Sequence, residues 1–81
     1  LYHLNLSSNE IKDEGMQALS PYISNLYYLN ELYLYSNGIG QEGIGTLSQN
    51  LYKLINLRHL SLGANSIGIE GIKMLHLSIS N

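Results

Sequence analysis

The amino-acid sequence predicts an α/β fold in which short parallel strands alternate with helices along a coil. Three observations predict it. The chain repeats itself every 28 residues, each repeat has a short segment of alternating apolar residues, and each has a longer segment with apolar residues at helical spacing. The repeats cover residues 1–28, 29–56 and 57–81, the last of them incomplete. We therefore expect one repetitive segment rather than several domains.

The period is clearest at apolar, asparagine and glycine positions. The first two repeats share 11 of 28 residues, far more than two unrelated segments would share. The recurring triplets are Leu4, Leu32 and Leu60; Leu6, Leu34 and Leu62; Asn9, Asn37 and Asn65; Ile11, Ile39 and Ile67; Gly15, Gly43 and Gly71; and Leu19, Leu47 and Leu75.

A short strand is predicted near the start of each repeat. Residues 4–6, 32–34 and 60–62 alternate apolar and other side chains, which is the pattern of a strand with one buried face. Because a helix separates successive strands, we expect the strands to lie parallel with right-handed crossovers.

A helix is predicted in the second half of each repeat, in the first from about Asp13 to Ser24. There Met16, Leu19 and Ile23 fall on one helical face. The equivalent faces of the later repeats are Ile44, Leu47 and Leu51, then Ile72, Leu75 and Ile79. Glutamates at 14, 42 and 70 mark the helix starts, where a carboxylate suits the positive end of the dipole, and Asp13 and Gln41 could support the first turn.

The asparagine column lies where the chain turns inward after each strand. An amide side chain carries two donors and an acceptor, so it can satisfy backbone groups that the turn leaves unpaired. We expect Asn9, Asn37 and Asn65 to form a ladder of paired amides.

At these residues the chain resembles a known family. The pattern LxxLxLxxNxIxxxGxxxL at residues 1–19, 29–47 and 57–75 is similar to the leucine-rich repeat, and the 28-residue length resembles its ribonuclease-inhibitor-like subclass. The resemblance implies a right-handed solenoid, a horseshoe segment with parallel strands on the concave face and helices on the convex face. It also implies a non-enzymatic scaffold that binds another macromolecule. The ribonuclease inhibitors are rich in cysteine, whereas this chain has none.

Composition excludes several classes of function. The net charge is −2, and the four basic residues are dispersed, which disfavours a nucleic-acid partner. No apolar run is long enough to span a membrane, so we expect no membrane partner. The absence of cysteine argues against a disulfide-stapled secreted domain, and we expect an intracellular, cytoplasmic setting.

The two ends of the chain carry core-type residues. Leu1 and Ile79 fall in core columns, and neither end has the polar cap that a solenoid needs. We therefore expect an internal fragment of a longer array, with self-association possible through the uncapped ends.

Candidate partner-binding residues are those on the strands that point away from the core. They form columns of equivalent positions: His3, Glu31 and His59; Asn5, Tyr33 and Ser61; and Ser7, Tyr35 and Gly63, with Tyr2, Asn30 and Arg58 beside them. Exposed tyrosines on a rigid strand are good anchors for a partner. The predicted protein-binding residues are Tyr33, Tyr35, Glu31, His3, His59, Asn5 and Arg58.

No catalytic residue, cofactor or metal site is predicted. Histidine and carboxylate are zinc ligands, but His3, Glu31 and His59 lie along a flat column and do not converge on one point. Two other roles stay open for the protein-binding module. It could be the ligand-sensing or autoinhibitory arm of a NOD-like receptor or another multidomain effector, or the activator of a small GTPase, like the activator of Ran.

Overall fold

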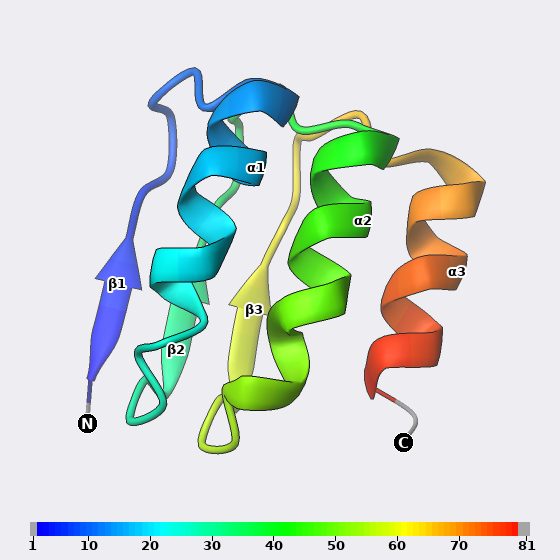
Figure 1. Cartoon of the computed structure of the whole chain (residues 1–81). Helices are drawn as coiled ribbons and strands as arrows, with labels where there is room; N and C mark the ends of the chain where they lie inside the picture. The colour runs from blue at the N-terminus through cyan, green and yellow to red at the C-terminus, as the bar shows by residue number, and fades with distance from the viewer. Residues whose placement is uncertain (1, 80–81) are drawn as a thin grey trace.

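The computed structural model describes residues 2–79 of the 81-residue chain, and side chains as far as residue 76. Strands and helices alternate along the chain (Figure 1). The elements are β1 (His3–Asn5), α1 (Lys12–Ile23), β2 (Glu31–Tyr33), α2 (Gln41–Asn50), a 3-10 turn (Leu51–Lys53), β3 (His59–Ser61) and α3 (Gly68–Ile79).

The strands form one parallel sheet in the order β1-β2-β3. Leu4 lies opposite Leu32, and Leu32 lies opposite Leu60, so equivalent residues of successive repeats are neighbours. The strands start one residue earlier than predicted and end before the second leucine of each pair. The ladder nevertheless continues there, because the Leu6 amide donates to the Tyr33 carbonyl at 2.9 Å and the Leu34 amide to the Ser61 carbonyl at 2.8 Å.

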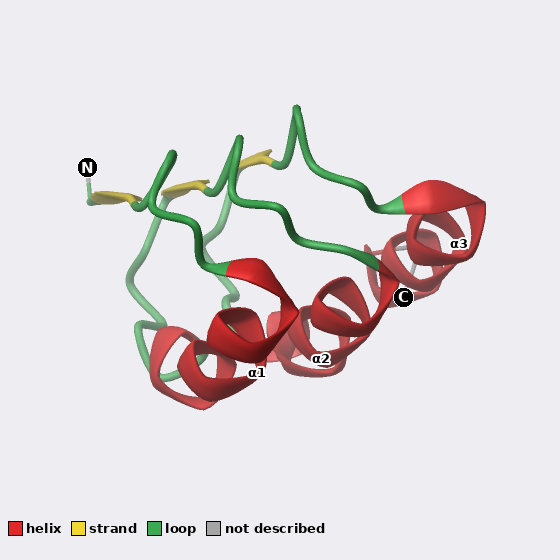
Figure 2. Ribbon diagram, turned by 90° about the horizontal axis from the view of Figure 1, so that it is seen from above, coloured by secondary structure: helices red, strands yellow, loops and turns green. Residues whose placement is uncertain are grey.

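Strands and helices occupy two separate layers (Figure 2). Neighbouring strands lie about 4.8 Å apart, whereas packed helices need about 8–10 Å. Because each strand is tied to one helix, the helical layer must spread more widely than the sheet. The sheet therefore lines the inner, concave side of the coil.

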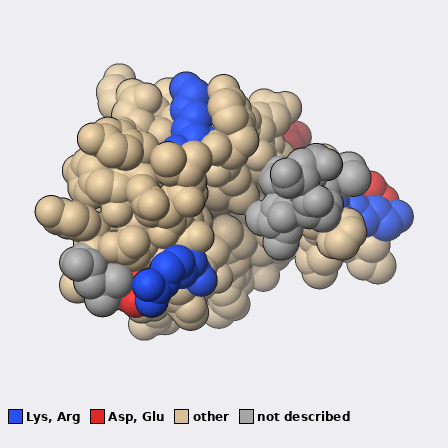
Figure 3. Space-filling model, turned by 90° about the horizontal axis from the view of Figure 1, so that it is seen from below, with Lys and Arg blue, Asp and Glu red and all other residues tan. Residues whose placement is uncertain are grey.

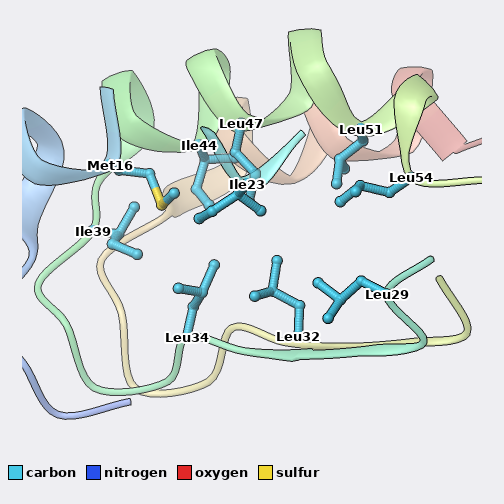
Figure 4. Close-up of a cluster of buried hydrophobic side chains, with 10 residues drawn as sticks. All are labelled: Met16, Ile23, Leu29, Leu32, Leu34, Ile39, Ile44, Leu47, Leu51 and Leu54. Atoms are coloured by element: carbon cyan, nitrogen blue, oxygen red, sulfur yellow. The ribbon is translucent and has the colours of Figure 1, made fainter. Parts of the chain in front are cut away.

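The hydrophobic core lies between the two layers and is centred on the second repeat (Figure 4). Its ten buried residues are Met16, Ile23, Leu29, Leu32, Leu34, Ile39, Ile44, Leu47, Leu51 and Leu54. The predicted helical faces of the first two repeats are confirmed: all their residues are buried except Leu19, which is partly buried against this core. The prediction is wrong for Ile72, which is 60% exposed, because no helix in the described part of the chain packs on that side of α3. Ile79, also predicted for that face, has a side chain outside the described residues.

The predicted asparagine column forms a ladder, although its amides bond to backbone rather than to one another. The Asn37 side chain is almost fully buried. Its oxygen accepts from the Asn9 amide at 2.8 Å, and its nitrogen donates at 3.0 Å to the carbonyls of Leu6 and Leu34. Asn65 repeats the arrangement by accepting from the Asn37 amide at 2.9 Å. Asn37 and Asn65 therefore each tie their own turn to the preceding repeat, whereas the Asn9 side chain bonds within its own turn.

The start of α2 is capped by a residue of the first repeat. Asp13 lies in the first turn of α1, as predicted, but its Oδ1 accepts from the Gly40 amide at 2.7 Å and from the Gly43 amide at 2.9 Å. A Cβ on Gly43 would lie 3.2 Å from the Asp13 Cα and 2.9 Å from Ile39 Cγ2. Glycine at this position therefore allows α1 and α2 to approach closely enough for the cap to form.

Candidate binding face of the sheet

The concave face presents the strand residues that alternate with the core leucines. Leu32 and Leu34 are fully buried on the core side. Because side chains alternate along a strand, Glu31, Tyr33 and Tyr35 point to the opposite, open side. Glu31 and Tyr33 are half-buried there, and Tyr35 is 45% exposed. We call these three residues the central stripe.

The register of the sheet places the members of each predicted column side by side on neighbouring strands. Glu31 pairs with His3 on one side and His59 on the other, and Tyr33 pairs with Asn5 and Ser61. Beyond the strands, hydrogen bonds from the Ser8 amide to the Tyr35 carbonyl and from the Ser36 amide to the Gly63 carbonyl, each 3.0 Å, hold the next column in step. Tyr35 therefore stands between Ser7 and Gly63.

Side-chain contacts order the central stripe. The Tyr33 hydroxyl donates to Glu31 Oε1 at 2.7 Å, and the Tyr33 ring centroid lies 5.1 Å from that of His59 at an angle of 44°. The hydrogen bond to Glu31 raises the pKa of the Tyr33 hydroxyl, and partial burial and the carboxylate charge add to the effect. Glu31, Tyr33 and His59 therefore form one contact group, which sequence spacing alone does not reveal.

The other predicted site residues lie around this group. His3 is exposed beside Glu31. Asn5 is exposed, and its side-chain oxygen accepts from the Ser7 amide at 3.0 Å, so it also supports the turn after β1. Arg58 is exposed directly before β3, and its amide donates to the Asn30 carbonyl at 2.8 Å. All seven predicted residues therefore belong to one continuous face or its border.

A second set of asparagine bonds was missed by the sequence analysis. The Asn30 side-chain oxygen accepts from the Tyr2 amide at 2.8 Å, and its nitrogen donates to the Asn56 carbonyl at 3.3 Å. Asn56 in turn donates to the Tyr27 carbonyl at 3.0 Å. These residues occupy different positions in their repeats, so the period gives no signal for them. Asn30 is therefore a structural residue at the border of the face.

Several exposed tyrosines lie away from the central stripe, where the loops return to the strands. Tyr2 and Tyr28 meet edge to face with ring centroids 5.0 Å apart, and Tyr27 meets Tyr28 in the same way at 5.6 Å. Tyr22 and Tyr52 are also exposed. Charged side chains are few and separated on this side of the molecule (Figure 3).

No described group of residues has the arrangement of a metal site. Among residues 2–76, no three His, Cys, Asp or Glu side chains are grouped to hold a metal ion. A cavity of about 480 Å³ lies at the third repeat, and six of its eight lining residues are leucines. Its two polar lining residues, Arg58 and His59, do not supply a nucleophile with a matching base. None of the helices within residues 2–79 has the length and apolar character that crossing a membrane requires.

Comparison with known proteins agrees with the geometry of the repeats. A family model for the leucine-rich repeat matches residues 1–20 and 53–75, together more than half of the chain. The chain belongs to the leucine-rich repeat family. No curated protein matches it at a significant level. Leucine-rich repeats are typically non-enzymatic modules that mediate interactions between proteins, and the α/β repeat structure fits this family.

Proposed function

We propose that this leucine-rich repeat segment is a non-enzymatic scaffold that binds a protein partner on the concave face of its sheet. The observation that carries the proposal is the central stripe, where two tyrosines and a glutamate stand on the open side of the middle strand. The parallel ladder fixes their backbone, so little conformational entropy is lost when a partner binds. Tyrosine adds a large contact area and a hydroxyl for hydrogen bonding.

The outer columns suit the edge of such an interface. His3 and Asn5 on one side, and Arg58 and His59 on the other, are exposed polar residues. A protein interface commonly has aromatic anchors at its centre and polar residues around them. This arrangement supports the concave face over the return-loop side, where the contacting Tyr27 and Tyr28 lie in a turn outside the strand ladder.

The proposal also covers the repeat subclass, the handedness of the coil and the cellular setting. The 28-residue period supports the ribonuclease-inhibitor-like subclass, and the general rule for parallel crossovers supports a right-handed coil. The proposal includes an intracellular setting, which the cysteine-free sequence supports.

Affinity capture from an extract of the source organism tests the proposal. The wild-type chain is compared with the double variant Tyr33→Ala/Tyr35→Ala and with the control Tyr22→Ala/Tyr52→Ala, which also removes two exposed tyrosines. We expect a protein that wild type and control retain and the stripe variant loses, because anchor tyrosines contribute about 1–2 kcal/mol or more each. Circular dichroism establishes that all three chains are folded. Equal capture by all three, or no specific capture by wild type, would contradict the proposal.

A further inference from the structure

We propose that Glu31, Tyr33 and Tyr35 form a subsite for an arginine side chain of the partner. This inference deepens the proposed function and rests on it, because it assigns the chemistry that the central stripe recognises. Three features of the stripe support it: a carboxylate that forms none of the ion pairs among the described side chains, the fixed orientation of that carboxylate, and short residues beside the two tyrosines in the sheet register.

The Glu31 carboxylate is available to a cation. Within the described side chains the recorded ion pair joins Glu70 and Lys73, with 3.5 Å between Nζ and Oε1, and Glu31 takes part in none. Its recorded side-chain hydrogen bond is the one from Tyr33 to Oε1. A carboxylate offers about four lone-pair sites, so most of its accepting capacity remains.

The hydrogen bond from Tyr33 also fixes where that charge stands. The carboxylate is held 2.7 Å from the hydroxyl at the tip of a ring that itself rests beside His59. An ordered anion loses less side-chain entropy when it pairs with a cation than a freely rotating one. This feature distinguishes Glu31 from Glu42, which is exposed in the first turn of α2.

Apart from His59, whose ring centroid lies 5.1 Å from that of Tyr33, the neighbours of the two rings are short. Asn5 and Ser61 flank Tyr33 in the sheet register, and Ser7 and Gly63 flank Tyr35. The tyrosine side chains are longer than these neighbours, so a planar group can lie against the Tyr35 ring and against the side of the Tyr33 ring that faces away from His59. Guanidinium fits best, because it is planar, stacks on aromatic faces and donates two parallel hydrogen bonds to a carboxylate. An ammonium group offers the charge without the planar contact.

An amide NMR titration with short peptides tests the subsite. One probe is a blocked glycine-serine peptide with a single arginine, and its partner carries citrulline, which keeps the shape but removes the charge. We expect the arginine peptide, titrated into the millimolar range, to shift the signals of Glu31, Tyr33 and Tyr35. The citrulline peptide should bind much more weakly, and a lysine peptide should fall between the two.

Matched variants locate the charge that matters. Glu31→Gln and Glu42→Gln each remove one negative charge from the chain. Glu31→Gln should weaken arginine-peptide binding about three- to five-fold, as expected for a partly exposed ion pair, while Glu42→Gln leaves it unchanged. The glutamine can still accept from Tyr33, so the fold of this variant should be retained.

Three results would overturn the subsite: no shifts on the stripe, equal binding of arginine and citrulline peptides, or equal loss in the two glutamine variants. Each of these leaves the proposed function standing if the tyrosine double variant still loses a captured protein. If capture does not depend on the tyrosines but the arginine peptide binds, the proposed function fails and the subsite is a local property of the sheet.

Discussion

At the scale of single residues, polar side chains order both the concave face and the turns that follow the strands. Tyr33 donates to Glu31 and lies beside His59 on the next strand. Asn37 bonds to the backbone of its own turn and of the preceding repeat. In both cases one side chain contacts two successive repeats and so helps to hold them in register. A substitution of one of these residues therefore changes the order of its neighbours as well as the surface that a partner would contact.

The Glu31–Tyr33 bond has a consequence that can be measured by titration. The pKa of the Tyr33 hydroxyl lies above its ordinary value of 10.0, first because of this bond. The folded chain therefore holds this proton more tightly than the unfolded chain does. The stabilisation is fully present below about pH 10 and is lost as the pH rises through the raised pKa. We expect Glu31→Gln to lower the pKa of Tyr33.

The measurement is the pH dependence of the Tyr33 Cζ resonance in chains with 13C-labelled tyrosine. Glu42→Gln serves as the control, because its carboxylate has no recorded bond to a tyrosine and should leave the Tyr33 titration in place. An unchanged Tyr33 pKa in Glu31→Gln would show that the bond to Glu31 is not the cause of the shift.

At the scale of elements, the start of α2 is capped by a residue of the preceding repeat. The residue that precedes α2, Gly40, has no side chain to cap the helix. Asp13 supplies the acceptor from α1. Gln41 holds the equivalent position in the second repeat, but among the described residues it makes no recorded bond to the start of α3 at Gly68. The two junctions between helices are therefore unequal.

This inequality predicts opposite effects for two substitutions. Asp13→Ala should destabilise the chain by about 1–2 kcal/mol, because it leaves two helix-start amides without an acceptor. Gln41→Asp should stabilise it by about 1 kcal/mol by providing the cap at Gly68 and Gly71. Urea unfolding at neutral pH measures both changes.

The adjacent Glu14→Ala is the control for charge, since Glu14 is exposed in the same turn of α1 and makes no such bond. An equal loss for Glu14→Ala and Asp13→Ala would attribute the effect to the helix dipole rather than to the cap.

At the scale of the whole molecule, the second repeat is stabilised from both sides. Leu32 and Leu34 are fully buried, whereas Leu60 and Leu62 are only partly buried at the third repeat. In a solenoid each repeat contacts only its neighbours, so stability is the sum of repeat and interface contributions. The middle repeat therefore has one more interface than either outer repeat.

Native-state hydrogen exchange should reveal this gradient. We expect the amides of α2 to exchange more slowly than those of α3, because opening α3 breaks one interface and opening α2 breaks two. Exchange at equal rates throughout both helices would show that the chain unfolds as a single unit. Gln41→Asp should narrow the difference, because it strengthens the junction between α2 and α3.

Much of the fold follows from the sequence. The alternation around Leu32 and Leu34 and the helical spacing of Met16 and Ile23 are local periodicities, and the constant repeat length stacks equivalent positions in register. The same register aligns His3, Glu31 and His59, so the candidate face was predictable residue by residue. Its role as a binding surface stays a prediction.

Tertiary structure alone determined which side chains make contact between repeats and at positions that do not follow the 28-residue period. The Asp13 cap, the Asn30 bonds and the exposure of Ile72 depend on how one coil sits against the next, whereas the Glu31–Tyr33 bond depends on side-chain conformations within one strand. A repeated sequence pattern specifies which element a position belongs to and whether it faces the core or the surface. The particular partner of a side chain depends instead on distances of a few ångströms between segments far apart in sequence, and these are fixed only when the layers pack.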